Sequence, residues 1–228
     1  RHDEAIREAK AALARDANII DIYINLGLIY VDQGKPDLAL FIYQKALNTI
    51  DGADDNATLH CNLGRAYLAK ERRPNARASL ARALEIAPEL VPALMYMAHL
   101  SMDDHDWDKT ASLLERALKS EPDNPAIHIN LGISYRGLGQ IEMAQKEYAR
   151  AQELDARELA RARGADGASF EVGDAQSLRD LADHSFDVLI NVQSALHYPR
   201  IDQFFAEVRR VVKPGGSFVI ADILSNGR

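Results

Sequence analysis

His197 is the side chain in this chain that is best suited to move a proton. It comes just after residues 186–192, an apolar stretch typical of a buried strand. Ligands of open α/β sheets collect beyond the carboxyl ends of the strands, and a histidine there could act as a general base toward a hydroxyl group. A partly exposed loop histidine without a chemical role would occupy the same position.

A second group of polar residues lies near the middle of the chain. His99 and Asp103 share one face of a predicted helix, so a metal ion is conceivable. The alternative is a solvated helix end followed by a turn, in which dense acidic residues are ordinary. We favour the turn and expect no metal. The group consists of His99, Asp103, Asp104, His105, Asp106 and Asp108.

The elements around His197 alternate between strand and helix. Residues 169–172 and 186–192 are expected to be strands, and apolar side chains from Ile201 to Val212 recur at helical spacing. Pro214, Gly215 and Gly216 should stop that helix, and residues 217–221 should form another buried strand. This alternation predicts an α/β unit with parallel strand pairing.

Residues 158–224 resemble the C-terminal part of class I methyltransferases that use S-adenosylmethionine. The resemblance rests on Val-Gly-Asp-Ala at 172–175, Ser-Phe-Asp-Val at 185–188 and the segment Glu207–Gly216. It implies that Asp174 and Ala175 face the adenine of the cofactor, with Asn191 close to it, and that His197 is the catalytic base. Without such a ligand, Asp174 would be a helix cap. Residues 191–199 look like the small-molecule and lipid O-methyltransferase branch of the family.

The chain departs from that family in the parts that hold the rest of the cofactor. No Asp-x-Gly-x-Gly-x-Gly motif occurs in it, and no counterpart of the family's first two strands precedes Glu158. We therefore expect no cofactor for this chain, and S-adenosylmethionine only if a full-length parent restores the motif. The strand at 186–192 would keep an unpaired flank, which could support self-association.

The first two thirds of the chain repeat one pattern. Asn-Leu-Gly at 25–27 recurs at 62–64 and 130–132, and the corresponding glycine or alanine positions are 37, 34 and 34 residues apart. These positions are Gly27, Gly64, Ala98 and Gly132. A fixed period of this length indicates stacked helix pairs, in which small residues lie where two helices come closest.

This repeat resembles the tetratricopeptide (TPR) family. The family pattern matches Leu26, Gly27, Tyr30, Ala39, Tyr43 and Ala46, and it matches best at Leu131, Gly132, Tyr135, Ala144, Tyr148 and Ala151. The resemblance implies a mainly α fold, a right-handed TPR α-solenoid of helix-turn-helix repeats, followed by a small and incomplete α/β (Rossmann-like) segment. We expect a half repeat and four repeats over residues 1–157 and a partial methyltransferase domain over residues 158–228.

The resemblance also implies a partner groove on the concave side, which is built from the first helices of the repeats. A peptide-carboxylate clamp is not expected, because Asn62 and Asn130 match the family's asparagines but the lysine positions do not match. A protein or peptide ligand with an apolar or amphipathic segment is expected instead. The groove residues are Ile24, Leu28, Val31, Cys61, Asn62, Arg65, Leu68, Met95, His99, Met102, Ile129, Asn130, Ile133 and Arg136.

Composition limits the remaining classes of function. The chain has 228 residues and a net charge of -7, which disfavours nucleic acid and anionic membrane as partners. The single cysteine, Cys61, suits a reducing compartment, and we expect a soluble cytoplasmic protein of bacterial type. The first residue is Arg1 and the pattern enters in mid-repeat, so we expect a truncated or fused piece from which a signal could have been trimmed.

Two functions are compatible with these observations. The first is a scaffold or adaptor that binds other proteins and has an appended, inactive methyltransferase fragment. The alternative is an S-adenosylmethionine-dependent small-molecule or lipid O-methyltransferase, present here in truncated form, whose repeats recruit a substrate or partner.

Overall fold

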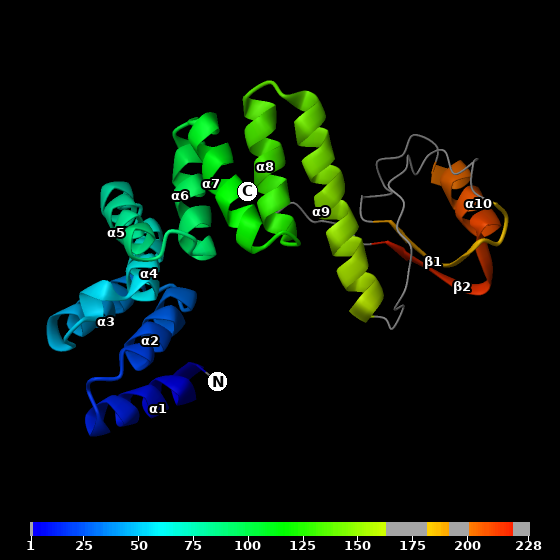
Figure 1. Ribbon diagram of the computed structural model, residues 1–228. Helices are drawn as coiled ribbons and strands as arrows, with labels where there is room; N and C mark the ends of the chain where they lie inside the picture. The colour runs from blue at the N-terminus through cyan, green and yellow to red at the C-terminus, as the bar shows by residue number, and fades with distance from the viewer. Residues whose placement is uncertain (1, 163–181, 192–200, 221–228) are drawn as a thin grey trace. The chain divides into compact units, whose positions relative to one another are not determined.

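The structure is a computed structural model that describes residues 2–162, 182–191 and 201–220 (Figure 1). The predicted strand at residues 169–172 lies outside these residues. By compactness the chain divides into one unit of residues 1–122 with 133–141 and a second of residues 123–132 with 142–228. Each unit is described by itself below. In the described part of the chain, no helix combines the length and the apolar character needed to cross a membrane.

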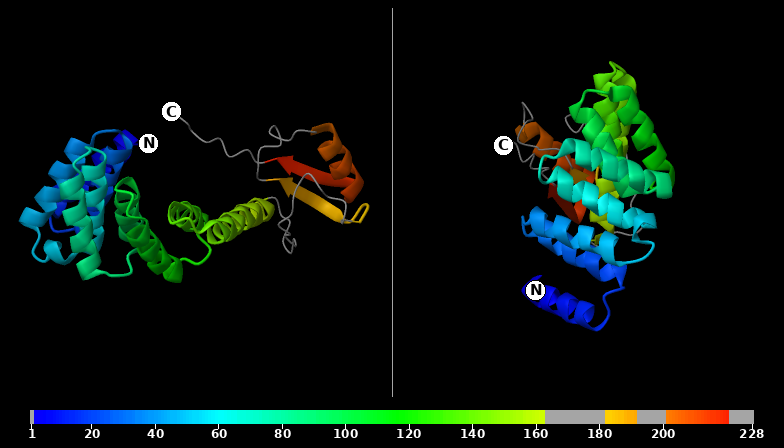
Figure 2. Two further views of the ribbon diagram at one scale, coloured as in Figure 1. Left: turned by 90° about the horizontal axis from the view of Figure 1, so that it is seen from above. Right: turned by 90° about the vertical axis from the view of Figure 1, so that its left-hand side faces the viewer.

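Residues 2–162 form helices in pairs, as the repeat pattern predicts. Figure 1 and the views in Figure 2 show α2 beside α3, α4 beside α5, and α6 beside α7. The helices are α1 (His2–Arg15), α2 (Ile20–Asp32), α3 (Pro36–Thr49), α4 (Ala57–Leu68), α5 (Arg73–Ile86), α6 (Val91–Asp103), α7 (Trp107–Ser120), α8 (Pro125–Gly137) and α9 (Ile141–Ala162), with a 3-10 turn at Ala53–Asp55.

The turn inside each repeat uses the same backbone conformation. The residue two positions before the second helix has a positive φ in every repeat: 70° at Gly34, 56° at Glu71, 58° at His105 and 75° at Gly139. Two of the four are glycines, which adopt this left-handed conformation without steric cost. In the connection between α3 and α4, the Asn56 side chain accepts a hydrogen bond from the Leu59 amide at 2.8 Å and so caps the N-terminus of α4.

Small residues lie at the closest approach of the two helices in a repeat. A Cβ atom on Gly64 would be 2.6 Å from Leu80 Cγ, so no side chain fits there without a shift. A Cβ on Gly27 would meet the ring of Tyr43 in the same way, and Ala98 takes the corresponding place in the third repeat with 1% of its surface exposed. This confirms the predicted packing role of these positions.

In three repeats, an arginine on the second helix contacts the loop that precedes the first helix of the same repeat. Arg82 contacts Asp54 at 3.1 Å, Arg116 donates to the Pro88 carbonyl at 2.5 Å, and Arg150 contacts Asp123 at 2.7 Å. The three arginines are 34 residues apart. Each arginine is about one third exposed, so solvent screens each contact and it stabilises the fold only slightly.

The described C-terminal residues form two strands and one helix. β1 (Phe186–Asn191) pairs in parallel with β2 (Val212–Ile220), and α10 (Ile201–Val211) lies between them in sequence. The predicted parallel pairing is therefore confirmed. The predicted start of the last strand at Ser217 is wrong, because β2 begins directly after α10.

An irregularity at the start of β2 explains this difference. Phe186 pairs with Val212, but Val188 already pairs with Ser217, so the intervening residues of β2 bulge out of the ladder. Gly215 has φ 84°, a conformation that glycine adopts without strain. The helix ends at Val211, before Pro214, so the prediction that Pro214–Gly216 stops it is wrong, and this segment lies within the irregular part of β2.

Candidate functional site

A hollow of about 540 Å³, open to solvent, lies in the first compact unit between the end of α4, the turn that follows it, and α6. Five of its six lining residues are polar or aromatic side chains that could bind a partner. They are Leu68, Glu71, Arg73, Tyr96, His99 and Asp103. Of the predicted groove residues, Leu68 and His99 line this hollow.

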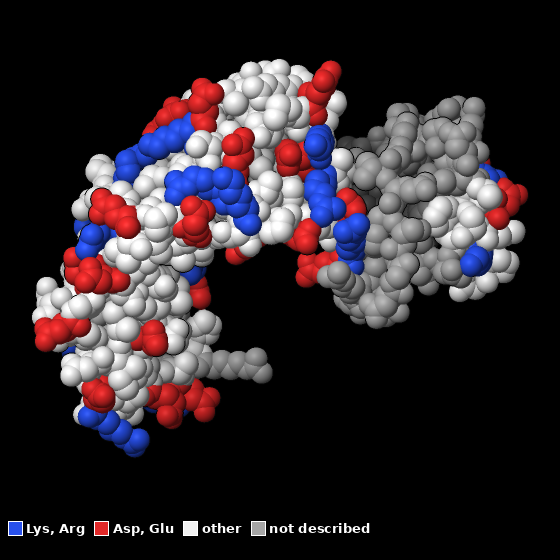
Figure 3. All heavy atoms as spheres, in the orientation of Figure 1, with Lys and Arg blue, Asp and Glu red and all other residues white. Residues whose placement is uncertain are grey.

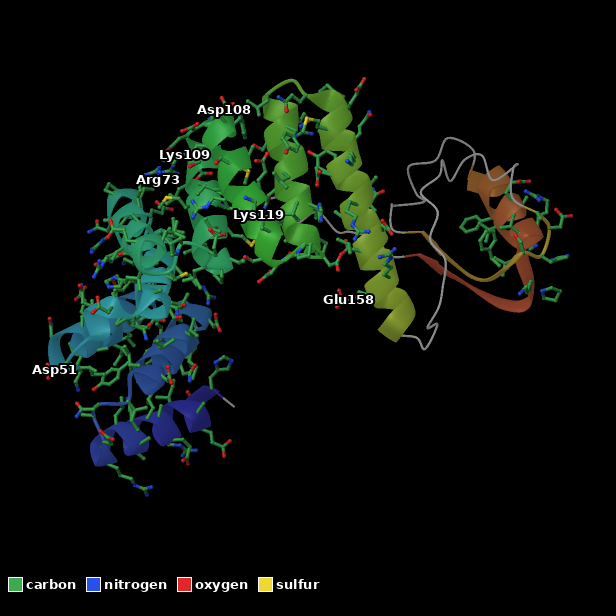
Figure 4. The ribbon with its side chains drawn as sticks, in the orientation of Figure 1. Asp51, Arg73, Asp108, Lys109, Lys119 and Glu158 are labelled. Atoms are coloured by element: carbon green, nitrogen blue, oxygen red, sulfur yellow. The ribbon has the colours of Figure 1, made fainter. Side chains whose placement is uncertain are left out.

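Arg73 is held in place at the edge of the hollow by two carboxylates. Its guanidinium contacts Asp103 at 2.6 Å and Asp104 at 2.5 Å, and it also donates to the Leu100 carbonyl at 3.2 Å. The hydrogen bond that Arg73 donates to Asp103 is the largest cause of the raised pKa of Arg73. Figure 4 shows Arg73 at the start of α5, near the start of α7. A cation fixed in this way can orient a ligand without first losing its own freedom of rotation.

The same contacts explain the acidic residues that could have suggested a metal. Asp104 also accepts from Arg77 at 2.5 Å, and Asp106 caps α7 through the Lys109 amide. His105 packs edge-on against Trp107, with ring centroids 5.4 Å apart. Among the residues that the structure describes, no group of three or more potential ligands is arranged to hold a metal ion. The carboxylates stabilise a turn and bind arginines.

A second polar contact lies nearer the start of the chain. Arg65 on α4 contacts Asp32 at the end of α2 at 2.7 Å, which links the first helices of two successive repeats. Burial raises the pKa of the Tyr96 hydroxyl on α6, while the charge of Arg65 lowers it. The charge of Arg65 acts in the same direction on the Cys61 thiol, one turn earlier on α4.

The burial of Cys61 leads to a testable prediction about the reactivity of its thiol. Burial raises the pKa of its thiol from the usual 9.0 to about 11, against the lowering effect of Arg65. Since the thiolate is the reactive form, iodoacetamide should alkylate the folded protein slowly. The rate should rise about tenfold per pH unit up to about pH 11, whereas in urea it should level off near pH 9. A native rate that levels off near pH 9, measured by mass spectrometry, would contradict this prediction.

The other predicted groove residues differ in how accessible they are. Ile24 and Cys61 are only 6% and 4% exposed, so their side chains are buried beneath the surface and are not accessible to a partner. The Asn62 side chain donates to the Thr58 carbonyl of its own helix at 2.9 Å. The accessible members are Leu28, Val31, Met95, Met102, Asn130 and Ile133, which are half-buried, and Ile129 and Arg136, which are exposed.

Glu71, Arg73 and Tyr96 line the hollow but were not among the predicted groove residues. The sequence does contain a signal for Arg73, because Asp103 and Asp104 have no lysine or arginine nearby in their own helix and so need a partner from elsewhere. Glu71 takes the turn position that glycine occupies at Gly34 and Gly139. Residue patterns within one repeat cannot show which residues of the preceding repeat will come close.

The residues predicted for methyl transfer are mostly outside the described part of the chain. Asp174, Ala175 and His197 lie there, and Asn191 is the last residue of β1. The described residues before α9 ends at Ala162 are helical or in turns, with no glycine-rich turn after a strand. They therefore do not fit the ribose and methionine parts of S-adenosylmethionine.

Comparison with protein families finds matches in both parts of the chain. Models of the tetratricopeptide repeat match residues 18–89 and 101–165. A methyltransferase domain model matches residues 137–220. The second repeat match and the methyltransferase match overlap at residues 137–165, which include α9.

The curated relatives match short stretches. A probable phthiotriol/phenolphthiotriol dimycocerosates methyltransferase 2 of Mycobacterium ulcerans is 49% identical over 57 residues, 25% of this chain and 22% of the relative. A fatty-acid O-methyltransferase of Mycolicibacterium smegmatis is 48% identical over 56 residues, 25% of this chain and 20% of the relative. The phthiotriol/phenolphthiotriol dimycocerosates methyltransferase of Mycobacterium leprae is 34% identical over 113 residues, 50% of this chain and 33% of the relative. The chain thus spans a third or less of these proteins.

Among solved structures, similar chains are found for the helical repeats. A crystal structure of MamA has a TM-score of 0.59 and 24% identity, covering 69% of this chain and 91% of its own. MamA from Desulfovibrio magneticus RS-1 has a TM-score of 0.57 and 18% identity, covering 68% of this chain and 86% of its own. At this level of identity the similarity shows the fold, a helical-repeat solenoid.

Proposed function

Because the chain consists of tetratricopeptide repeats followed by a C-terminal methyltransferase sequence, we propose that its repeats are a protein-interaction scaffold. The observation that carries the proposal is the hollow between α4 and α6, whose lining mixes apolar, aromatic and charged side chains. The partner would be an apolar or amphipathic segment of another protein.

The chemistry of this face favours such a segment over an acidic C-terminal tail. Tyr96 and Leu68 offer apolar contact in the hollow. Met95 and Met102, which lie on α6 with Tyr96, are half-buried and can adapt to varied side chains. The charge of Arg73 is already neutralised by Asp103 and Asp104. In Figure 3 acidic and basic side chains are interspersed over the visible helices, so neither sign dominates the surface seen in that view.

A peptide array tests this proposal. Amphipathic peptides should bind the full chain better than peptides that end in a free acidic carboxylate. Tyr96→Ala should weaken that binding by roughly tenfold, the effect of losing about 1.4 kcal/mol at one buried aromatic contact. Phe41→Ala is the matched control, because Phe41 is 64% exposed on the second helix of its repeat. A preference for free acidic C-termini that disappears in Asn62→Ala would overturn the proposal.

A second candidate function is methyl transfer by the parent protein. The parallel pairing of β1 with β2 and the identity of 47–49% to mycobacterial methyltransferases over short stretches support it. In this candidate, S-adenosylmethionine supplies the methyl group, His197 takes a proton from the acceptor hydroxyl, and Asp174 with Ala175 and Asn191 holds the adenine. The repeats would then recruit a substrate or partner.

The setting proposed for the protein is the cytoplasm. A single cysteine that is buried and protonated suits a reducing compartment but does not require one. We also propose that the protein can self-associate through its sheet. In the described residues β1 and β2 pair only with each other, so each strand leaves one edge open for pairing with another chain.

A further inference from the structure

The charged side chains that line the hollow between α4 and α6 leave one carboxylate unpaired. These side chains are Glu71, Arg73 and Asp103. Arg73 contacts Asp103 at 2.6 Å and Asp104 at 2.5 Å. Arg77 also contacts Asp104 at 2.5 Å, so the two arginines and the two aspartates cancel each other's charge. Among the described residues, Glu71 has no ion pair and no side-chain hydrogen bond, so its carboxylate gives the lining a net negative charge.

Arg73 does not offer an anion site in spite of its own charge. Its Nη2 atom donates to the Leu100 carbonyl at 3.2 Å and to Asp104 at 2.5 Å, which uses both of its hydrogens. Its Nη1 atom donates to Asp103 at 2.6 Å. A carboxylate from a partner would have to displace one of these acceptors, and it would also meet the negative charge of Glu71. The hollow therefore disfavours an anion and favours a cation.

Glu71 occupies a backbone position that suits glycine. Its φ is 56°, and the corresponding turn residues of two other repeats are Gly34 and Gly139, at 70° and 75°. In the remaining repeat this residue is His105, whose ring packs against Trp107 and so has a structural role. The exposed Glu71 side chain makes no such contact with the residues that the structure describes. Backbone strain is frequent at binding sites, and here it places a carboxylate in the lining of the hollow.

Leu68 and Tyr96 supply the apolar part of the lining. A lysine or arginine side chain has an apolar stem and a charged end, so its stem could lie along these two side chains while its end reaches Glu71. The face of the Tyr96 ring also attracts a cation. Arginine suits this lining better than lysine, because its planar guanidinium can stack on a ring and donate two parallel hydrogen bonds to a carboxylate.

We propose that the hollow between α4 and α6 binds an arginine side chain of the partner segment. The inference rests on the scaffold function proposed above and adds what the segment carries, an arginine beside its apolar residues. Glu71 accepts the hydrogen bonds of the guanidinium, and the Tyr96 ring stacks on it. The net charge of -7 of the whole chain favours the approach of a basic segment in the same way.

The direct test uses N-acetylarginine methylamide as the probe. With leucine methyl groups labelled for NMR, titrating this probe into the full chain should shift the Leu68 signals and saturate, with a dissociation constant on the order of millimolar. N-acetylcitrulline methylamide has nearly the same shape without the charge, so it should bind roughly tenfold more weakly. No saturable shift at Leu68, or equal binding of the two probes, would overturn the proposal.

Variants of Glu71 locate the response. Glu71→Gln keeps the length of the side chain and should reduce the affinity for the arginine probe to that for the citrulline probe. Glu71→Gly removes the carboxylate at a position that glycine adopts without strain, so the fold should persist while the response is lost. Glu8→Gln is the matched control, because it makes the same change of charge at an exposed position of α1 and should keep the response. An arginine response that survives in both Glu71 variants would overturn the site.

The peptide array separates this inference from the function on which it rests. In amphipathic peptides that bind the full chain, replacing arginine by citrulline should weaken binding to the parent roughly tenfold and should leave binding to Glu71→Gln unchanged. Peptides that bind equally well with citrulline would keep the scaffold function and overturn the arginine site. A Glu71-dependent response to the arginine probe, in a chain that binds no amphipathic peptide, would keep the arginine site and overturn the amphipathic partner.

Discussion

S-adenosylmethionine titrated into this chain is expected to give no saturable heat at micromolar concentrations. The methyltransferase resemblance supplies one contact region, the adenine site at Asp174 and Ala175. The glycine-rich turn and the acidic residue that would bind the ribose hydroxyls have no counterpart in the sequence. Losing charge-assisted hydrogen bonds of about 1.5–3 kcal/mol each moves a micromolar dissociation constant beyond millimolar, since about 1.4 kcal/mol is tenfold.

The continuity of α9 supports this expectation. The family's cofactor strand and turn would have to come before Glu158, but α9 runs without a break from Ile141 to Ala162. The described residues before it contain only helices and turns. Side chains cannot replace the backbone amides of a missing glycine-rich turn, so a different pocket would be needed.

Adenosine is the control ligand for this titration. It keeps the adenine and ribose, so it should bind as weakly as the full cofactor if only the adenine site is present. A micromolar dissociation constant for S-adenosylmethionine that is lost in Asp174→Ala would contradict the prediction. That result would mean that the chain forms the cofactor site by another route, and it would favour the methyltransferase function.

The helix pairs could be predicted because their determinants are local. Gly27 and Tyr43 belong to one repeat, and their contact follows from spacing within 34-residue units. The same holds for the parallel pairing of β1 and β2, because the strand-helix-strand order leaves few alternatives. Periodicity therefore determined most of the fold that the structure describes.

The candidate site could not be predicted to the same extent, because its contacts connect successive repeats. Arg73 reaches Asp103, 30 residues later in the chain. Whether a groove position is covered or accessible depends on such neighbours, as the burial of Ile24 and Cys61 shows.

Replacing Gly132 by leucine is expected to destabilise the protein by about 1–3 kcal/mol or more. Gly132 lies on α8 where a Cβ atom would already meet the ring of Tyr148 on α9. A leucine must push that ring away or separate the two helices. The melting temperature should fall by roughly 2–4 °C for each kcal/mol in a protein of this size, measured by circular dichroism.

Two further variants separate packing from other effects of the leucine. Ala126→Leu adds the same side chain at an exposed position of α8 and should change stability by no more than about 0.5 kcal/mol. In the double variant with Tyr148→Ala, the space left by the ring should accept the leucine, so the double variant should lose less stability than the sum of the single losses. Additive losses, or an unchanged melting temperature for Gly132→Leu, would mean that α8 and α9 do not approach each other at Gly132.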